Sequence, residues 1–394
     1  MAAQRVVVIG AGAFGGWTAL ELRRRGARVT VIDAWGPGNA RASSGGETRV
    51  IRGIYGARTH YTALAARSLQ RWREFEAAVG RRIFHRTGAL WLLDGSPAAR
   101  SFAGVSADAV RAHGMSVHDL TTLEASRRYP QFDLADVATV MLEPEAGYLL
   151  ARRACEDVIQ LFESEGGTYR LGAASTPVAL DGRGRNKLRL GGGTALEADA
   201  FIFACGPWLG SLFPKEIGRR VIPTRQEVYY FGTPPGDARF SDMALPVWID
   251  LTGPKPSAFY GIPGNAHRGF KLSDDAAGPE MDPTTGEREP SAAGLTSARA
   301  FLARRFPSLA SAPLLDTEVC QYEATPDSEL IVDRHPEAEN VWLVGGGSGH
   351  GFKLGPAVGE LVASMVLGKG AVDPRYALTR FAAAPGQGRQ EKWT

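Results

Sequence analysis

The chain has 394 residues, enough for two or three domains, and its 44% hydrophobic and 22% charged residues are typical of a globular protein. Its formal net charge is only +3 and no run of lysine and arginine forms a basic tail, which argues against a nucleic-acid-binding protein. Three cysteines make no disulfide framework, and neither a secretory signal nor an apolar run of about 20 residues stands out, so we expect a cytoplasmic protein without a membrane partner.

The start of the chain predicts a strand, a helix and a second strand. Residues 5–9 form a continuous apolar, β-branched run, which is typical of a strand buried on both faces. A glycine loop follows, and then a helix over residues 14–25 that Gly26 terminates. Residues 28–33 form the second strand, so the chain opens with a βαβ unit.

Three glycines occupy the turn between the first strand and the helix, where a dinucleotide-binding loop belongs. Gly10 permits a tight turn, Gly12 lets a pyrophosphate approach the positive end of the helix, and Gly15 allows close packing of helix and strand. Asp33, at the end of the second strand, is placed to accept hydrogen bonds from an adenosine ribose. These residues predict dinucleotide binding without distinguishing FAD from NAD, and the alternative is a tight turn in some other α/β protein.

Helical and strand-like segments alternate through the rest of the chain, with no internal repeat. We expect helices over residues 60–79, 97–113, 121–128, 151–165 and 292–305, and a last helix from near Gly355. We expect strands over residues 83–93, 138–142, 201–205, 315–322, 329–333 and 341–344. Between residues 220 and 290, short strands separated by many glycines and prolines predict an antiparallel sheet.

A second glycine-rich loop, residues 345–353, joins a strand to the last helix. Cofactor segments at both ends of the chain suit a flavin held along its length, which favours FAD. The predicted fold is an α/β FAD-binding domain of the Rossmann type, interleaved with an α+β substrate domain built on an antiparallel sheet. We assign residues 1–82, 143–218 and 315–375 to the FAD-binding domain, 83–142 and 219–314 to the substrate domain, and 376–394 to an irregular C-terminal tail.

Four segments, residues 47–52, 320–327, 331–336 and 349–353, point to a family. The second has the spacing Cys-x-Tyr-x-x-Thr-x-Asp, and the fourth reads Gly-His-Gly-Phe-Lys. In this order, and over nearly the whole chain, they resemble the monomeric sarcosine oxidase and N-methyltryptophan oxidase family. These are FAD-dependent amine oxidases of the D-amino-acid oxidase fold, and the resemblance implies a monomer.

The resemblance assigns Cys320 a bond through its sulfur to the 8α carbon of the flavin. By residue type alone, a free cysteine is more often a small buried core residue. Because of the family resemblance we nevertheless expect a covalent FAD at Cys320. We interpret Cys155 and Cys205 as structural.

The resemblance also implies roles for four cations. Arg52 and Lys353 would hold the substrate carboxylate, since arginine pairs bidentately with a carboxylate and lysine adds a compact second charge. Arg49 would lie close to the flavin ring, and Lys271 would stabilise superoxide as it forms from oxygen. The alternatives are surface or ion-paired cations for the first pair and a solvated strand lysine at 271.

Other residues match the walls of the family site. Tyr260 and Tyr322 match tyrosines of the substrate pocket, and core packing is their alternative. Cofactor contacts are implied for Thr48, Gly349, His350, Gly351, Phe352 and Lys353. No histidine spacing is typical of a metal site, so we predict none.

Two positions depart from the family pattern. The family has a histidine four residues after the oxygen-activating lysine, where this chain has Asp275, and a loop histidine where it has Gly45. An acid at 275 that faces the pocket would favour a substrate with an extra positive charge or hydroxyl groups. The alternative is a loop carboxylate, and either way sarcosine itself is in doubt as the substrate.

The predicted function is the flavin-dependent oxidation of a small secondary amine that bears a carboxylate, an N-methyl or cyclic amino acid, to an imine. Oxygen would be reduced to hydrogen peroxide. Three alternatives stay open: an amine dehydrogenase that uses another acceptor, a non-catalytic FAD-binding protein, and an NAD-dependent dehydrogenase.

Overall fold

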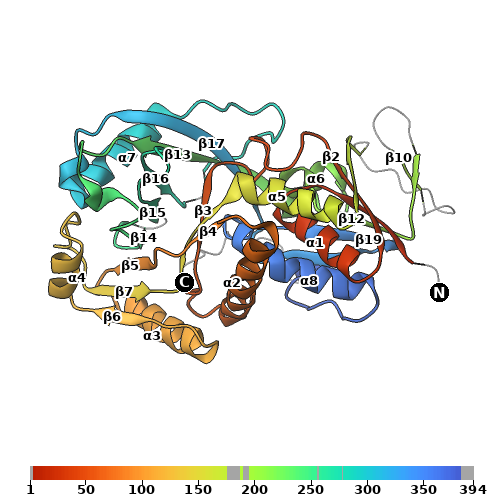
Figure 1. Ribbon diagram of the computed structural model, residues 1–394, viewed down its shortest axis with the longest axis horizontal. Coiled ribbons are helices and arrows are strands. Elements are labelled where there is room, and N and C mark those ends of the chain that lie inside the picture. Colours follow the sequence, from red (N-terminus) through yellow and green to blue (C-terminus); the bar gives the residue numbers. More distant parts are fainter. Residues whose placement is uncertain (1–2, 175–186, 190–194, 255–256, 277, 383–394) are drawn as a thin grey trace.

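The computed structural model describes residues 3–174, 187–189, 195–254, 257–276 and 278–382. Two large sheets lie toward opposite ends of the molecule's long axis (Figure 1). Two small sheets complete the set: β3 (Thr48–Ile51), β8 (Gly147–Leu150) and β4 (Phe84–His85) form one, and β10 (Lys187–Arg189) and β11 (Ala195–Glu197) the other.

The six-stranded sheet has the order β18-β19-β12-β1-β2-β9, and only the β18–β19 pair is antiparallel among its described strands. Its strands are β1 (Arg5–Ile9), β2 (Arg28–Asp33), β9 (Thr168–Leu171), β12 (Ala200–Phe203), β18 (Ile331–His335) and β19 (Ala338–Gly345). Because β1 and β12 are parallel and central, their carboxyl ends form the crevice where α/β sheets bind ligands.

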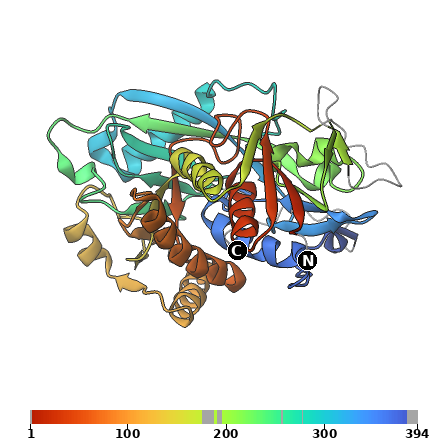
Figure 2. The ribbon, with the colours of Figure 1, turned by 45° about the vertical axis from the view of Figure 1, so that its right-hand side comes forward.

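Helices cover one face of this sheet. They are α1 (Ala13–Arg24), α2 (Thr59–Val79), α5 (Ala151–Ser164) and α8 (Gly355–Val366). In the view turned by 45°, red α1 lies against blue α8 (Figure 2). Val6 and Val8 of β1 pack on this side, while Val7 and Ile9 pack on the other side with the short helix α6 (Leu209–Leu212). Both faces are buried, which explains the continuous apolar run.

The eight-stranded sheet has the order β17-β13-β16-β15-β14-β5-β7-β6. Its strands are β5 (Ala89–Leu93), β6 (His118–Leu120), β7 (Thr139–Glu143), β13 (Ile222–Phe231), β14 (Val247–Asp250), β15 (Phe259–Ile262), β16 (Phe270–Asp274) and β17 (Leu314–Ala324). One face packs with α7 (Ala292–Arg305) and α4 (Thr122–Arg128), and the other with α3 (Pro97–Ala112).

The strands between residues 220 and 290 pair antiparallel, as expected, but the whole sheet is mixed because β14 runs parallel to β5. A long excursion of the chain separates these two strands, as a parallel pair requires. The last strand, β17, also joins this sheet through antiparallel pairing with β13, where Cys320 faces Gln226. The sequence-based boundaries place residues from 315 onward in the cofactor domain, and these boundaries stay a prediction.

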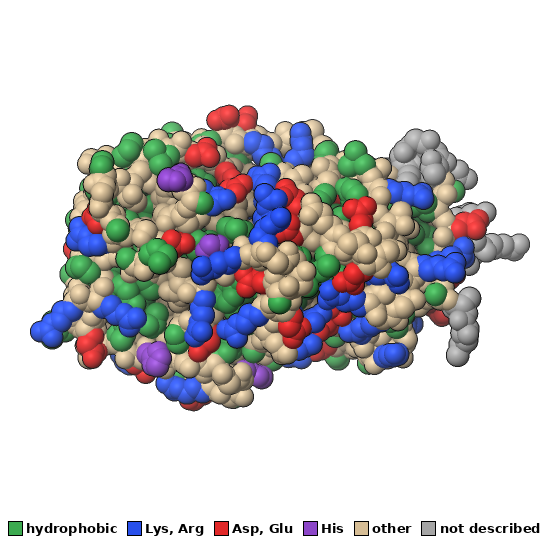
Figure 3. Space-filling view, viewed as in Figure 1, with side chains coloured by type: hydrophobic (Ala, Val, Ile, Leu, Met, Phe, Trp, Pro, Cys, Tyr) green, Lys and Arg blue, Asp and Glu red, His purple; other side chains and the backbone are tan. Residues whose placement is uncertain are grey.

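The expected irregular tail is partly ordered, since Leu378–Ala382 form a 3-10 helix and the rest of that tail, 383–394, lies outside the described residues. On the face shown in Figure 3, basic and acidic side chains are intermingled. Among the described residues, no helix combines the length and hydrophobicity that crossing a membrane demands.

Candidate active site

One cavity extends from the glycine loop after β1, past the ends of β12 and β19, to the eight-stranded sheet. The residues predicted from the sequence that line it are Gly10, Gly12, Asp33, Arg49, Arg52, Tyr260, Asp275, Cys320, Tyr322, Gly349, His350, Gly351, Phe352 and Lys353. Gly15, Thr48 and Lys271, which were also predicted, are not part of this lining. The structure therefore brings most of the predicted residues around one space.

At the nucleotide end, Asp33 fixes the backbone of the loop. Its Oδ2 accepts a hydrogen bond from Ala11 N at 2.8 Å, and its Oδ1 accepts one from Trp35 N at 2.9 Å. Gly10 has φ +108°, and a Cβ there would lie 2.3 Å from Ala204 O. Only glycine is tolerated at this turn, as the motif predicts.

The amino end of α1 is open to an anion. Its N-cap residue is Gly12, which has no capping side chain, and Ser44 Oγ accepts the Ala13 N–H at 3.0 Å instead. Gly15 packs behind the loop, since a Cβ there would lie 1.9 Å from Gly10 O. A helix N-terminus that faces a cavity through glycine fits the diphosphate of a dinucleotide, and the residues present suit FAD.

Cys320 lies half-buried in β17 beside a cation. Arg49 Nη2 lies 3.1 Å from Cys320 Sγ and also donates to Ser43 O at 3.1 Å. Burial opposes the charge of Arg49, but Cys320 and the nearby Tyr260 outweigh it and raise the pKa of the guanidinium.

Gly45, where the family has a histidine, is required by close packing. A Cβ at this position would lie 2.4 Å from Asn39 O and 3.0 Å from Ala42 O. Its own carbonyl oxygen accepts from Arg49 Nη2 at 2.5 Å. The turn therefore supplies a backbone acceptor for Arg49, and it has no room for an imidazole.

Arg52 and Lys353 both line the cavity and contact the same residue, Tyr55. The Arg52 guanidinium carbon lies 4.3 Å from the ring centre of Tyr55 and 5.0 Å from that of Trp91. Lys353 Nζ donates to Tyr55 Oη at 3.1 Å and to His350 O at 2.8 Å. Burial raises the pKa of Tyr55 to about 12, so the hydroxyl that accepts from Lys353 stays protonated.

Glu143 is a buried glutamate that the sequence did not single out. It holds the backbone that follows Arg52. Glu143 Oε2 accepts from Gly53 N at 2.7 Å and from Ile54 N at 3.2 Å, and its Oε1 accepts from Trp91 Nε1 at 2.7 Å. Burial raises the pKa of this carboxyl. Glu143 ends β7 without any distinguishing motif, so no sequence signal separated it from other acids.

Tyr322 and Asp275 form a pair in the cavity wall. Tyr322 Oη donates to Asp275 Oδ1 at 2.7 Å, and both residues line the cavity with Tyr260. Burial raises the pKa of both tyrosines, and Asp275 adds to the effect. Asp275 thus lines the cavity beside Tyr322, and its role toward a substrate stays a prediction.

Lys271 lies behind the wall, with only 1% of its surface exposed. Its Nζ donates to Thr48 O at 2.8 Å and lies 3.4 Å from Thr48 Oγ1. Burial, followed by the nearby charge of Arg49, lowers the pKa of Lys271 to about 7. This lysine is therefore not the solvated strand residue that was its alternative.

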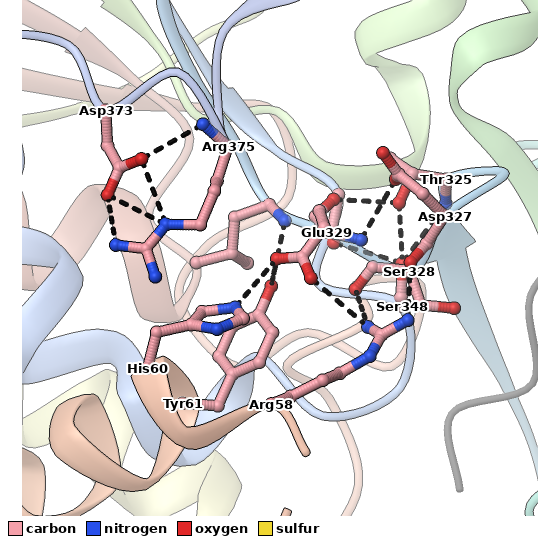
Figure 4. Close-up of polar contacts among 12 residues, drawn as sticks. Arg58, His60, Tyr61, Thr325, Asp327, Ser328, Glu329, Ser348, Asp373 and Arg375 are labelled. Carbon is pink, nitrogen blue, oxygen red and sulfur yellow. Dashed lines mark hydrogen bonds and ion pairs between the residues drawn. The ribbon is translucent and has the colours of Figure 1, made fainter. Parts of the chain in front are cut away.

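A polar cluster beneath the second glycine loop centres on Glu329 (Figure 4). Tyr61 Oη donates to Glu329 Oε2 at 2.7 Å, and His60 Nε2 lies 3.1 Å from the same oxygen. Arg58 Nη1 lies 3.5 Å from Glu329 Oε1. These contacts join the start of α2 to the segment that precedes β18.

The same segment supports the loop that carries Lys353. Ser348 Oγ accepts from Thr325 N at 3.1 Å, and Thr325 Oγ1 donates to Glu329 O at 2.8 Å (Figure 4). His350 Nε2 lies 3.0 Å from Ser328 O. The segment from Thr325 to Ser328 thus contacts the loop through hydrogen bonds to the side chains of Ser348 and His350.

Comparison with known proteins identifies the family. The family described as FAD dependent oxidoreductase matches residues 5–365. The chain belongs to this family. It is an FAD-dependent oxidoreductase, which confirms the resemblance seen in the sequence. Monomeric sarcosine oxidase of Bacillus sp. (strain B-0618) is 30% identical over 371 residues, 92% of each chain. N-methyl-L-tryptophan oxidase of Yersinia pestis (strain Pestoides F) is 26% identical over 368 residues, 91% of this chain and 93% of that protein.

Solved structures of this oxidoreductase fold cover almost the whole chain. L-proline dehydrogenase from P. horikoshii aligns with a TM-score of 0.82 at 21% identity, over 97% of this chain and 98% of that one. Amadoriase II, a fructosamine oxidase from Aspergillus fumigatus, aligns with a TM-score of 0.78 at 22% identity, over 97% and 91%. These alignments show a shared fold.

Proposed function

We propose that this oxidoreductase oxidises a small secondary amine that bears a carboxylate, an N-methyl or cyclic amino acid, to an imine. The main support for the proposal is that Arg52 and Lys353, two buried cations from distant segments, line the same cavity. A guanidinium and an ammonium side by side suit a carboxylate. The names of the two relatives, sarcosine oxidase and N-methyl-L-tryptophan oxidase, denote oxidation of N-methyl amino acids, which supports this substrate class.

The two cations would orient the substrate. Holding the carboxylate fixes the position of the carbon next to the amine, and such orientation can lower a barrier by several kcal/mol. Bound FAD supplies the two-electron redox chemistry, while the chain supplies position and charge. Overall the amine loses two electrons and two protons, and oxygen takes up both as hydrogen peroxide. In this account Lys271, behind the wall, provides the positive charge for the oxygen step.

Cys320 is the proposed point of covalent attachment of FAD. The support is local: the thiol lines the cavity and lies 3.1 Å from Arg49 Nη2. The test is denaturation of the purified protein. Yellow colour should stay with the unfolded polypeptide and should be released from a Cys320→Ser variant. Colour that washes away from the wild-type chain would contradict the attachment.

Asp275 refines the substrate class. Its carboxylate, oriented by Tyr322 Oη, lies in the same cavity as the two cations. A substrate with hydroxyl groups or a second positive charge would place them toward this acid, since a carboxylate accepts hydrogen bonds and attracts cations. Sugar-modified amino acids and amino acids with a basic side chain therefore belong among the candidates.

The experiment that tests the function is an anaerobic screen of the purified protein. N-methyl amino acids, cyclic imino acids and sugar-modified amino acids are mixed with it, and the visible flavin absorbance is followed. Bleaching by at least one carboxylate-bearing secondary amine is expected. If none bleaches the flavin, the proposal fails. Admission of oxygen then separates an oxidase from a dehydrogenase, which would regain its colour slowly with oxygen and quickly with an artificial dye.

A further inference from the structure

Glu323 is a buried carboxylate in the cavity wall that neither the motif analysis nor the proposed mechanism uses. It belongs to β17, three residues after Cys320, and only 7% of its surface is exposed. Its Oε1 accepts a hydrogen bond from Gly347 N at 3.1 Å. Its Oε2 is buried and has no hydrogen-bond partner among the residues that the structure describes. Buried carboxylate oxygens are normally satisfied, so this one indicates a missing partner.

Two glycine turns make room for this side chain. A Cβ on Gly206 would lie 3.0 Å from Glu323 Oε2, and a Cβ on Gly347 would lie 2.8 Å from Glu323 Oε1. Gly206 follows β12 and Gly347 follows β19, and both line the cavity with Glu323. Any side chain at either position would press on the carboxylate.

The location of Glu323 relates it to the dinucleotide. In the six-stranded sheet the order β19-β12-β1 places the turns at Gly206 and Gly347 next to the glycine loop after β1. The carboxyl ends of such parallel strands are where a dinucleotide crosses the sheet. Glu323 reaches this edge from the other sheet, because β17 extends into the cavity from its pairing with β13.

The chemistry of the carboxyl suits a cofactor contact. Burial raises the pKa of Glu323 to about 7. Near neutral pH its second oxygen is therefore available both as a protonated donor and as an ionised acceptor. FAD carries hydroxyl donors and carbonyl and phosphate acceptors along its length, so either form finds a partner on it.

We propose that Glu323 is a cofactor-binding residue whose Oε2 forms a hydrogen bond with FAD between the turns at Gly206 and Gly347. The inference rests on membership of the FAD dependent oxidoreductase family and on the unpaired oxygen. It does not depend on which amine is oxidised, nor on how Cys320 holds the flavin. A purely structural role, in which Glu323 only secures the Gly347 backbone, is the competing explanation.

The test measures FAD affinity in a Cys320→Ser background, so that the flavin exchanges freely. Glu323→Ala and Glu323→Gln are compared with the parent by FAD fluorescence titration and by the visible spectrum of the bound flavin. Asp316→Asn, an exposed acid in the same strand, is the matched control. Thermal melting of each flavin-free variant reports any purely structural loss.

We expect Glu323→Ala to weaken FAD binding about tenfold or more, which corresponds to about 1.4 kcal/mol, and to shift the flavin spectrum. Glu323→Gln, which keeps a donor and an acceptor, should stay within about threefold of the parent, and Asp316→Asn should be unchanged. Two results would overturn the inference: Glu323→Ala with parental affinity and spectrum, whatever its melting temperature, or equal losses in the alanine and glutamine variants. A failed amine screen would leave all of these affinities unaffected.

Discussion

Replacing Lys271 by methionine tests the cost of burying an amine in this fold. Burial lowers the pKa of Lys271 from 10.5 to about 7, and one pKa unit corresponds to about 1.4 kcal/mol. A charged Lys271 therefore destabilises the folded state by about 5 kcal/mol relative to an unshifted lysine. Methionine has a similar size but cannot donate the hydrogen bond that Lys271 makes to Thr48 O. Losing this bond cancels about 2 kcal/mol of the stability gained by removing the buried charge. We expect Lys271→Met to stabilise the fold by about 3 kcal/mol at pH 6.

The sign of the pH dependence follows from the lowered pKa. The penalty is fully present below pH 7, where Lys271 is charged in both states, and it disappears as the pH rises toward 10.5, where the unfolded lysine is also neutral. Urea unfolding of the wild type and of Lys271→Met at pH 6 and at pH 9.5 measures this difference. The exposed Lys215→Met is the control and should change stability by less than about 0.5 kcal/mol. A variant less stable than the wild type at pH 6, or one with the same gain at both pH values, would refute the reasoning.

Other residues give further predictions. Arg52→Met should raise the KM for a carboxylate-bearing amine about 10- to 100-fold at unchanged flavin content, because it removes a charge-assisted hydrogen bond to the carboxylate. Steady-state kinetics with an unaltered KM would contradict the proposal that Arg52 binds the carboxylate. Asp275→Asn should lower kcat/KM about tenfold more for hydroxylated or positively charged amines than for simple N-methyl amino acids, and an equal change for both classes would argue against its role in specificity. Tyr61→Phe should lower the free energy of unfolding by about 1–3 kcal/mol, because the Leu330 N–H and Glu329 lose their bonds to Tyr61 Oη; chemical denaturation with an unchanged midpoint would show that the cluster does not stabilise the loop.

The first βαβ unit was predictable because its signals are local. Gly15 packs against Gly10 O of the same turn, and Asp33 bonds to Ala11 N of that turn. The apolar run of β1 is buried on both faces, as its composition predicts. For such segments, hydrophobic pattern and backbone constraint lead to the same answer.

The remainder of the site depends on contacts between distant segments. The bond from Tyr322 to Asp275 exists only because β17 and β16 both pair with β13, a register that no local pattern specifies. Glu143 and Glu323 look like ordinary strand acids in the sequence. Their burial arises when the two sheets and their loops close over them. The family resemblance singled out Lys271, but only the structure shows that this side chain is fully buried.

The central claim is that Arg52 and Lys353 receive the carboxylate of a secondary amine that then reduces the flavin. The most direct measurement is anaerobic stopped-flow mixing of the protein with an N-methyl or cyclic amino acid and, separately, with the carboxamide of the same compound. The two differ only in the charged group that the cations would hold. We predict that the acid bleaches the flavin with a second-order rate constant about 100-fold or more above that of the carboxamide, in line with about 3 kcal/mol from a charge-assisted hydrogen bond. Equal rate constants for the two compounds, or no bleaching by any such acid, would contradict the account.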